Sequence, residues 1–569
     1  MQKWSENYRA YAQKKKLSRE EPLSGKRGPH FLGTLLDENL AQFEQSIGAN
    51  GDLAVREFQI ARRYRAALVF LSSMTDQKGI QENILKPLML WRENESGDNG
   101  GYEDSGDSVV SDSSASLENS LIDRLWNETI YINEGQKTSD LSLLFNLLTS
   151  GHVLLLLDRC GEALAFAMRQ IEKRGIEQPQ TEQVIRGARE GFIELLDTNL
   201  SLIRYRLQSP DLKIETGPVG QRTNSRVAVC YLNGIADPEL VEEAMLRISK
   251  IDFDGIIDAG YIEQFIEDQP ISPFPQVQNT ERPDKAVAAL LEGRVIIMVD
   301  GSSFALIVPA LFDQFFQTVD DYSERFIIGS LVRIIRLVAL LFSLFFPSLY
   351  VSVISYNPEL LPTDFAVAIS GGRAGVPFPA VLEVFIMEVS MEILREATIR
   401  LPQMIGGALS IVGVLVVGQA AVSAGLASPI TVVIVALTTI GSFATPAYNA
   451  AIALRMLRFP LILLAGLFGL YGVMIGTILI INHLLYLESF GIPYLFTLVT
   501  GMRERLTDTV IRVPLWWMNR RPSHLHPVDA TRLPDGETQS YIDGIFRTKE
   551  RAHEQEAKNL NDPNRPRRR

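Results

Sequence analysis

The stretch LVALLFSLFFPSLYVSVI, from Leu337 to Ile354, contains no charged residue and is the first of four long apolar runs in this chain. At about 1.5 Å per helical residue, roughly 20 apolar residues cross a hydrocarbon core of about 30 Å. We therefore expect each run to be a membrane span. The four runs are Leu337 to Ile354, Met404 to Leu426, Ile430 to Ala447 and Phe459 to Ile481.

The charges around these runs suggest an orientation. Arginines tend to remain on the cytoplasmic side of a membrane. Five of them flank the runs, and all five can be placed on one side: Arg333, Arg336, Arg400, Arg455 and Arg458. The other side receives the loops Asn357-Pro-Glu359 and Ala427-Ser-Pro429.

Between the first two runs lies an amphipathic helix, PAVLEVFIMEVSMEILREATIRL, from Pro379 to Leu401. At 100° per residue, four ionisable residues share one polar arc and apolar residues occupy the rest of the surface. Glu383 falls outside this arc. The four residues, which we treat as candidate pore-lining positions, are Glu388, Glu392, Arg395 and Glu396.

Two interpretations fit this polar arc. Ionisable residues within a span normally face a bundle interior or a water-filled path, which predicts a pore or cavity. An interfacial helix with a solvated face, carrying Glu392/Arg395 and Glu396/Arg400 pairs, is the alternative. If Asn357 lies outside and Arg400 inside, the helix must cross the membrane, which favours the first interpretation.

The region before the spans alternates strand-like and helix-like segments, as in α/β domains. Short buried strands are expected at Ala66 to Ser73, His152 to Asp158, Arg226 to Leu232 and Arg294 to Gly301. Asp237 to Ile251 is an amphipathic helix with Asp237 as its N-cap. The predicted fold class is a cytoplasmic α/β N-terminal domain of two subdomains followed by an α-helical multi-span membrane domain.

The expected domain boundaries follow from shifts in composition. The N-terminus has no apolar segment of a signal peptide, so the N-terminal domain should be cytoplasmic. An acidic, Gly/Ser-rich insert is expected to be disordered. The ranges are a polar tail 1–30, subdomains 31–208 (with the insert 93–118) and 209–325, a membrane domain 326–502, and a polar cytoplasmic tail 503–569.

Beyond the last run, Gly491-Ile-Pro493 interrupts the pattern, leaving pieces too short to span the membrane as straight helices. The arginines that follow favour the cytoplasm, so the chain should return through the membrane here or by a re-entrant path.

Several function classes are disfavoured. The chain has 569 residues and a net charge of −12, which gives no support to nucleic-acid binding. It has no phosphate-binding loop, no HExxH and no GxSxG motif, so we expect no enzyme, no cofactor and no metal. Cys160 and Cys230 lack metal-ligand spacing and should be buried, reduced thiols.

Pairs of small residues four positions apart occur within the spans. Such pairs let helix backbones approach closely, within one chain or between chains. The pairs are Gly406 and Ser410, Ala465 and Gly469, and Gly472 and Gly476.

Longer motifs resemble the GerA family of bacterial spore germination proteins, in particular the A subunit of nutrient germinant receptors. The resemblance runs from about Gly51 to Pro522, and the insert 93–118 and the tail after Pro522 depart from it. The motifs are GDLAVREFQI (Gly51 to Ile60), REGFIELLDTNLSLIRYRL (Arg189 to Leu207), Gly260 to Pro309, DDYSERF (Asp320 to Phe326), YNPELLPTDFAVAI (Tyr356 to Ile369), Ala374 to Pro402 and TDTVIRVPLWWMNRRP (Thr507 to Pro522).

The resemblance implies a multi-pass protein of the spore inner membrane with both termini in the cytoplasm. It would work beside a transporter-like B subunit that binds the nutrient and a lipoprotein C subunit, in contact with membrane lipid. As a homo-oligomer it would form a ligand-gated cation channel that releases ions in germination. The alternatives are a non-conducting scaffold that couples the nutrient-binding subunit to downstream machinery, and the homologue that accompanies the dipicolinate-release channel.

Overall fold

The computed structural model describes residues 31–48, 50–91, 121–132, 134–170, 178–399, 416–499, 508–532, 540 and 544. Arg400, Gly406, Ser410 and the insert 93–118 lie outside these ranges. The described chain separates into two compact units. The N-terminal unit runs to Ala310 and also contains Leu487–Tyr494, and the helical unit contains Leu311–Tyr486 and the residues from Leu495 onward.

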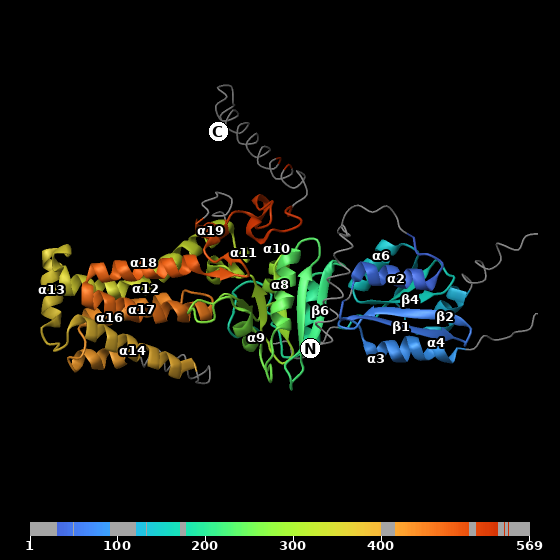
Figure 1. Cartoon of the computed structure of the whole chain (residues 1–569), viewed down its shortest axis with the longest axis horizontal. Helices are drawn as coiled ribbons and strands as arrows, with labels where there is room; N and C mark the ends of the chain where they lie inside the picture. The colour runs from blue at the N-terminus through green and yellow to red at the C-terminus, as the bar shows by residue number, and fades with distance from the viewer. Residues whose placement is uncertain are drawn as a thin grey trace, which may run out of the picture. The chain divides into compact units, whose positions relative to one another are not determined.

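The first half of the N-terminal unit is built on a five-stranded antiparallel sheet in the order β1-β2-β4-β5-β3. Figure 1 shows α2 and α6 on one face of this sheet and α3 and α4 on the other, and each face has its own buried apolar cluster. The strands are β1 (Leu53–Ile60), β2 (Tyr64–Leu71), β3 (Gly135–Thr138), β4 (His152–Leu157) and β5 (Ala163–Ala167). The helical segments are α2 (Leu36–Ile47), α3 (Gln77–Gly79), η1 (Ile80–Leu85), α4 (Lys86–Leu90), η2 (Leu125–Thr129) and α6 (Leu141–Thr149).

The second half is a five-stranded antiparallel sheet in the order β6-β7-β9-β10-β8. Helices α8 and α9 contribute to the apolar cluster on one face, and α7 and α10 to the cluster on the other. The strands are β6 (Leu212–Val219), β7 (Ser225–Leu232), β8 (Gln278–Thr280), β9 (Val295–Val299) and β10 (Ala305–Val308). The helices are α7 (Leu196–Arg206), α8 (Pro238–Ser249), α9 (Ala259–Ile266) and α10 (Pro283–Glu292).

The four strands predicted from buried apolar runs are present as β2, β4, β7 and β9. The predicted helix is α8, and the Asp237 carboxylate accepts a hydrogen bond from the backbone N–H of Glu239, as an N-cap should. The predicted mixture of strands and helices is therefore confirmed, with antiparallel pairing in both sheets.

The two sheets are a tandem repeat of one fold. Their strand orders are identical when each sheet is numbered separately. The sequence LLDENL (Leu35–Leu40) recurs as LLDTNL (Leu195–Leu200) at the start of the corresponding helices. Asn39 and Asn199 make matching hydrogen bonds to the backbone six residues earlier.

The repeat extends to the sheet. The backbone N–H of Leu36 donates to Asp158 just after β4, and that of Leu196 donates to Asp300 just after β9, each at 3.1 Å. The same helix start is thus held by the same strand end in both halves. Because α7 is the counterpart of α2, the second repeat begins before α7.

A buried ion pair joins the two repeats. Arg204 of α7 donates to both carboxylate oxygens of Asp52, which precedes β1, at 2.6 and 2.8 Å. Both side chains are almost fully buried. Removing one partner would leave a buried charge without compensation, so this contact fixes the two repeats firmly against each other.

The helical unit contains a bundle of apolar helices (Figure 1). Among the described helices, α12 and α17 are long and apolar enough to cross a membrane, while α16 and α18 are shorter apolar helices. The main helices are α12 (Phe326–Tyr356), α13 (Thr363–Arg373), α14 (Ala380–Ile399), α16 (Pro429–Ser442), α17 (Tyr448–Phe468) and α18 (Leu470–Tyr486). The short segments are η3 (Phe312–Phe316), α11 (Asp320–Ser323), η4 (Pro358–Leu360), α19 (Phe496–Val499), η5 (Leu515–Trp517) and η6 (Ser523–Leu525).

The fourth apolar run is not one straight span. It is divided at Gly469, whose positive φ of 60° is a left-handed conformation that ends α17. Helix α18 then packs closely against α17. A Cβ at Gly472 would collide with the carbonyl oxygen of Leu464, and one at Gly476 would collide with the Leu461 side chain. These two glycines therefore allow the backbones of α17 and α18 to approach closely.

Candidate functional site

A buried ion pair lies at the centre of the helical bundle. Arg458 of α17 donates from Nη1 to Oε2 of Glu388 on α14 at 2.6 Å, and both residues are 3% exposed. Arg458 Nη2 donates to Ser343 Oγ of α12 at 2.7 Å, and Thr438 Oγ1 of α16 donates to Glu388 Oε1 at 3.2 Å. Four helices thus meet at one carboxylate and one guanidinium group.

A second set of charged residues follows along the same helices. Arg395 on α14 donates to Glu392 at 3.1 Å and to Ser442 Oγ of α16 at 2.9 Å. Arg455 of α17 lies 3.3 Å from the other oxygen of Glu392. We call the five charged residues that join α14 to α16 and α17 the charge network: Glu388, Glu392, Arg395, Arg455 and Arg458.

The charge network explains why α14 and α17 pack in an antiparallel arrangement. Glu388 and Glu392 are four residues apart on α14, and their partners Arg458 and Arg455 are three residues apart on α17, in reverse order. Such spacings place each pair on one helix face. The sequence contains this signal, because the arginine spacing on α17 complements the carboxylate spacing on α14.

Arg455 and Arg458 therefore do not flank two spans, and that prediction from the sequence was wrong. They lie inside α17 and are buried. A guanidinium group is costly within an apolar bundle unless it is paired, and the carboxylates of α14 provide that pairing.

The four polar-arc residues have different surroundings. Glu388 and Arg395 are buried in the bundle of the single chain. The Glu392 side chain is 42% exposed although it binds arginines, and Glu396 is exposed. Among the described residues, the open part of the arc is therefore acidic.

Glu383, which lay outside the predicted polar arc, has a structural role. It is fully buried, and its carboxylate accepts hydrogen bonds from Arg373 at 3.2 Å and from the backbone N–H of Ser428 at 2.5 Å. Ser428 in turn caps the N-terminus of α16. Glu383 thus connects α13 and α14 to the start of α16.

A further buried ion cluster lies at the start of α12. Asp321 accepts hydrogen bonds from Arg333 at 2.9 Å and from Arg336 at 3.1 Å, and Asp508 accepts from Arg333 at 3.0 Å. Burial alone would raise the pKa of Asp321, but the two arginines outweigh it and hold that pKa below its usual value. Asp321 is therefore ionised at neutral pH, and it anchors the start of α12.

The stretch after α18 was predicted to re-enter the membrane, and the structure instead folds it into the N-terminal unit. It forms a hairpin of β11 (Glu488–Ser489) and β12 (Ile492–Pro493). Ser489 Oγ accepts from the backbone N–H of Ala310 at 3.0 Å and donates to the carbonyl of Gln276 at 2.7 Å. Gly491, with φ 75°, makes the tight turn that allows this pairing.

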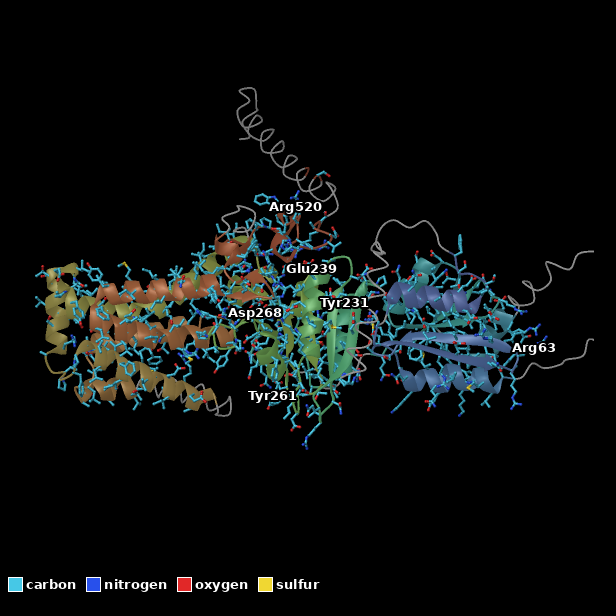
Figure 2. The ribbon with its side chains drawn as sticks, in the orientation of Figure 1. Arg63, Tyr231, Glu239, Tyr261, Asp268 and Arg520 are labelled. Carbon is cyan, nitrogen blue, oxygen red and sulfur yellow. The ribbon has the colours of Figure 1, made fainter. Side chains whose placement is uncertain are left out.

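Aromatic contacts complete the hairpin's attachment. Tyr494 is buried and donates to the carbonyl of Pro275 at 2.7 Å. The Arg247 guanidinium stacks 4.2 Å from the centre of the Phe490 ring. Asp268, labelled in Figure 2, accepts from the Phe490 backbone N–H and from Arg247, both at 2.7 Å. Leu487–Tyr494 is thus an integral part of the second repeat.

Among the residues that the structure describes, no group of three or more histidine, cysteine or acidic side chains could hold a metal ion. Cys160 and Cys230 are free thiols, both buried. Burial raises the pKa of Cys230 to about 12, so this thiol is not a nucleophile at neutral pH.

Comparison with known proteins shows similarity along most of the chain. A family model described as "Bacillus/Clostridium GerA spore germination protein" matches residues 41–524. "Spore germination protein KA" of Bacillus subtilis (strain 168) is 39% identical over 509 residues, covering 89% of this chain and 90% of that protein. "Spore germination protein GerLA" of Bacillus cereus is 36% identical over 510 residues, covering 88% and 99%.

Among solved structures, the N-terminal domain of the A subunit of the Bacillus megaterium spore germinant receptor GerK3 is similar to part of this chain. The two are 32% identical, and the match covers 50% of this chain and 99% of that one, with a TM-score of 0.37.

Proposed function

This chain belongs to the GerA family of spore germination proteins, and from that membership we propose that it is the A-type membrane subunit of a nutrient germinant receptor in the spore inner membrane. Its partners are a transporter-like B subunit, a lipoprotein C subunit and further copies of itself. Both termini face the cytoplasm. The repeat-containing N-terminal unit is then the cytoplasmic part, and the helical unit is the membrane part.

The activity of this subunit is a nutrient-gated cation conductance. The charge network is the observation that supports this assignment. An isolated charge at the centre of a bilayer costs about 2.5–3.5 kcal/mol even on insertion scales, so charged residues in spans mark ion pathways or switches. This bundle carries five such residues on α14 and α17.

The residues of the polar arc have two roles, ion pairing within the bundle and lining of the conducting path. Glu388 and Arg395 are buried inside one chain, whereas Glu392, which also pairs with Arg395 and Arg455, and Glu396 retain exposed surface on the same helix. When several copies assemble, Glu392 and Glu396 line the path and present a ring of negative charge, as acidic rings do in cation channels. The Glu388–Arg458 pair holds α14 against α17.

Nutrient-triggered potassium release from spores tests this assignment. Glu392→Gln and Glu396→Gln remove the charge but retain size and hydrogen bonding, so the double variant should release potassium several-fold more slowly per receptor molecule. Abundance is measured by immunoblot alongside, because Glu392 also pairs with Arg395 and Arg455. Glu359→Gln is a matched control, because Glu359 is an exposed acid in the loop after α12 and does not belong to the charge network. Wild-type release by the double variant would remove these residues from the path.

A non-conducting scaffold is the second candidate, and the hairpin Leu487–Tyr494 favours it. This segment directly follows α18 and is built into the second repeat, so it would transmit movement of the bundle without any conductance. In a scaffold, weakening the hairpin would abolish germination, while substitutions at Glu392 and Glu396 would have no effect.

A further inference from the structure

The segment that follows the bundle packs on the first turns of α12. The backbone N–H of Arg512 donates to Ser330 Oγ at 3.1 Å, and Ser330 Oγ donates to the Arg512 carbonyl at 3.0 Å. Arg512 also donates to the carbonyls of Tyr322 and Glu324. The rings of Phe326 and Trp516 meet edge to face, with centres 6.4 Å apart. This contact fixes residues 508–517 beside the start of the first span.

The outer surface of this assembly is apolar. Ile511, Leu515 and Trp517 are each more than half exposed. The first turns of α12, which bind this segment through Phe326 and Ser330, also carry exposed apolar residues, among them Ile327 and Leu331. We call these five residues the apolar collar. Large exposed apolar patches are rare on surfaces that face only water, so the collar needs a partner.

The length of α12 places the collar at the edge of the bilayer. Its 31 residues extend about 46 Å at 1.5 Å per residue, whereas the hydrocarbon core is about 30 Å thick. If Leu337–Tyr356 fills the core, the first turns of α12 project into the headgroup zone. Arg333 and Arg336, at this boundary, both pair with Asp321, and Arg333 also pairs with Asp508.

We propose that the apolar collar is a membrane-interface anchor that rests in the headgroup zone of the phospholipid bilayer, with Trp517 and Leu515 at the level of the lipid carbonyls. Tryptophan is favoured at this level because its ring is apolar and its N–H can bind polar groups. The collar fixes the depth of α12 in the bilayer, and it connects the segment that follows the bundle to the first turns of α12. This inference depends on α12 crossing a membrane and is independent of ion conductance.

Depth-dependent fluorescence quenching of the full chain in lipid vesicles tests the proposal. Trp517→Cys, in a background with Cys160→Ala and Cys230→Ala, carries an environment-sensitive dye. Nitroxide on the lipid headgroup should quench this dye at least twofold more strongly than either nitroxide deep in the acyl chain or iodide in the water. Ile511→Cys gives a second position, should the first variant fail to fold.

Two control positions calibrate the measurement. Leu341→Cys, an exposed position well inside α12, should be quenched most by the deep nitroxide. Tyr131→Cys, in the N-terminal unit and 80% exposed, should be quenched most by iodide. The proposal is wrong if the dye at residue 517 behaves like that at residue 131, which means a solvated segment. Protection from all three quenchers would also overturn it, since that result means a protein-protein interface.

Discussion

Glu388 and Arg458 come from helices α14 and α17, lie 70 residues apart in the chain, and form a 2.6 Å ion pair that is almost completely buried. In a bundle of apolar helices this pair determines which face of α14 meets α17. Its energy arises from two charges that have no access to water, so its loss has a larger effect than loss of a surface pair.

Glu388→Gln should therefore lower protein abundance in the membrane. The change leaves Arg458 buried without its counter-charge, at a cost of about 3–5 kcal/mol. Glu388→Leu combined with Arg458→Met removes both charges and should restore abundance to near the wild-type level, as measured by immunoblot of membrane fractions. Normal abundance of the single variant would mean that water reaches the pair.

Gly472→Ala should disrupt the close packing of α17 against α18. A Cβ at residue 472 collides with the Leu464 carbonyl, which is backbone and cannot move without moving the helix. We expect thermal unfolding in detergent to occur several degrees lower, since overpacking typically costs about 1–3 kcal/mol. Gly371→Ala is the control: it also lies within a helix, nothing approaches its Cβ position within 4 Å, and stability should be unchanged or slightly higher.

Ser489→Ala should loosen the hairpin from the second repeat. The change leaves the buried N–H of Ala310 and carbonyl of Gln276 without their shared hydroxyl partner, at a cost of about 1–3 kcal/mol. Hydrogen exchange of residues 487–494 should accelerate about tenfold or more while protection of β9 is retained. Glu488→Gln, at the exposed neighbouring position, serves as the control. Equal protection in the Ser489 variant would show that the hairpin is held by its apolar contacts alone.

Stability of the second repeat should decrease as pH rises from about 5 to 8. Burial, followed by the charges of Glu267 and Asp258, raises the pKa of Glu263 on α9 to about 7, above its value of about 4.3 in an unfolded chain. The folded state therefore binds the proton more tightly, and the resulting stabilisation is lost as pH rises through 7. Glu263→Gln should remove this dependence, raising the protection of α9 amides at pH 8 after correction for intrinsic exchange. A pH dependence unchanged in that variant would assign the effect to other groups.

The sequence predicted the fold class well, because buried strands and amphipathic helices have strong local patterns. β2, β4, β7, β9 and the capped helix α8 were all recognisable in this way. The recurrence of LLDENL as LLDTNL is a signal of the same kind, because internal similarity can be read directly from the residues of the two repeats.

Other features depend on partners that are distant in the chain. Arg455 and Arg458 resembled loop residues because an arginine in an apolar run is costly by itself, and only the carboxylates of α14 make it stable. The fourth run resembled one span because hydropathy does not register the left-handed backbone at Gly469. The hairpin was predicted to return through the membrane because the residues that bind it lie more than 200 positions earlier in the chain, where no local pattern reveals the contact.

Conductance of the purified receptor complex in planar bilayers under a potassium chloride gradient tests the central claim most directly. We predict a nutrient-dependent current whose reversal potential lies near that of potassium. In a Glu392→Lys, Glu396→Lys double variant the reversal potential should shift toward that of chloride, because the ring of charge changes sign. Absence of any nutrient-dependent current from the complete complex, or a reversal potential identical in wild type and double variant, would contradict the assignment of α14 to a cation path.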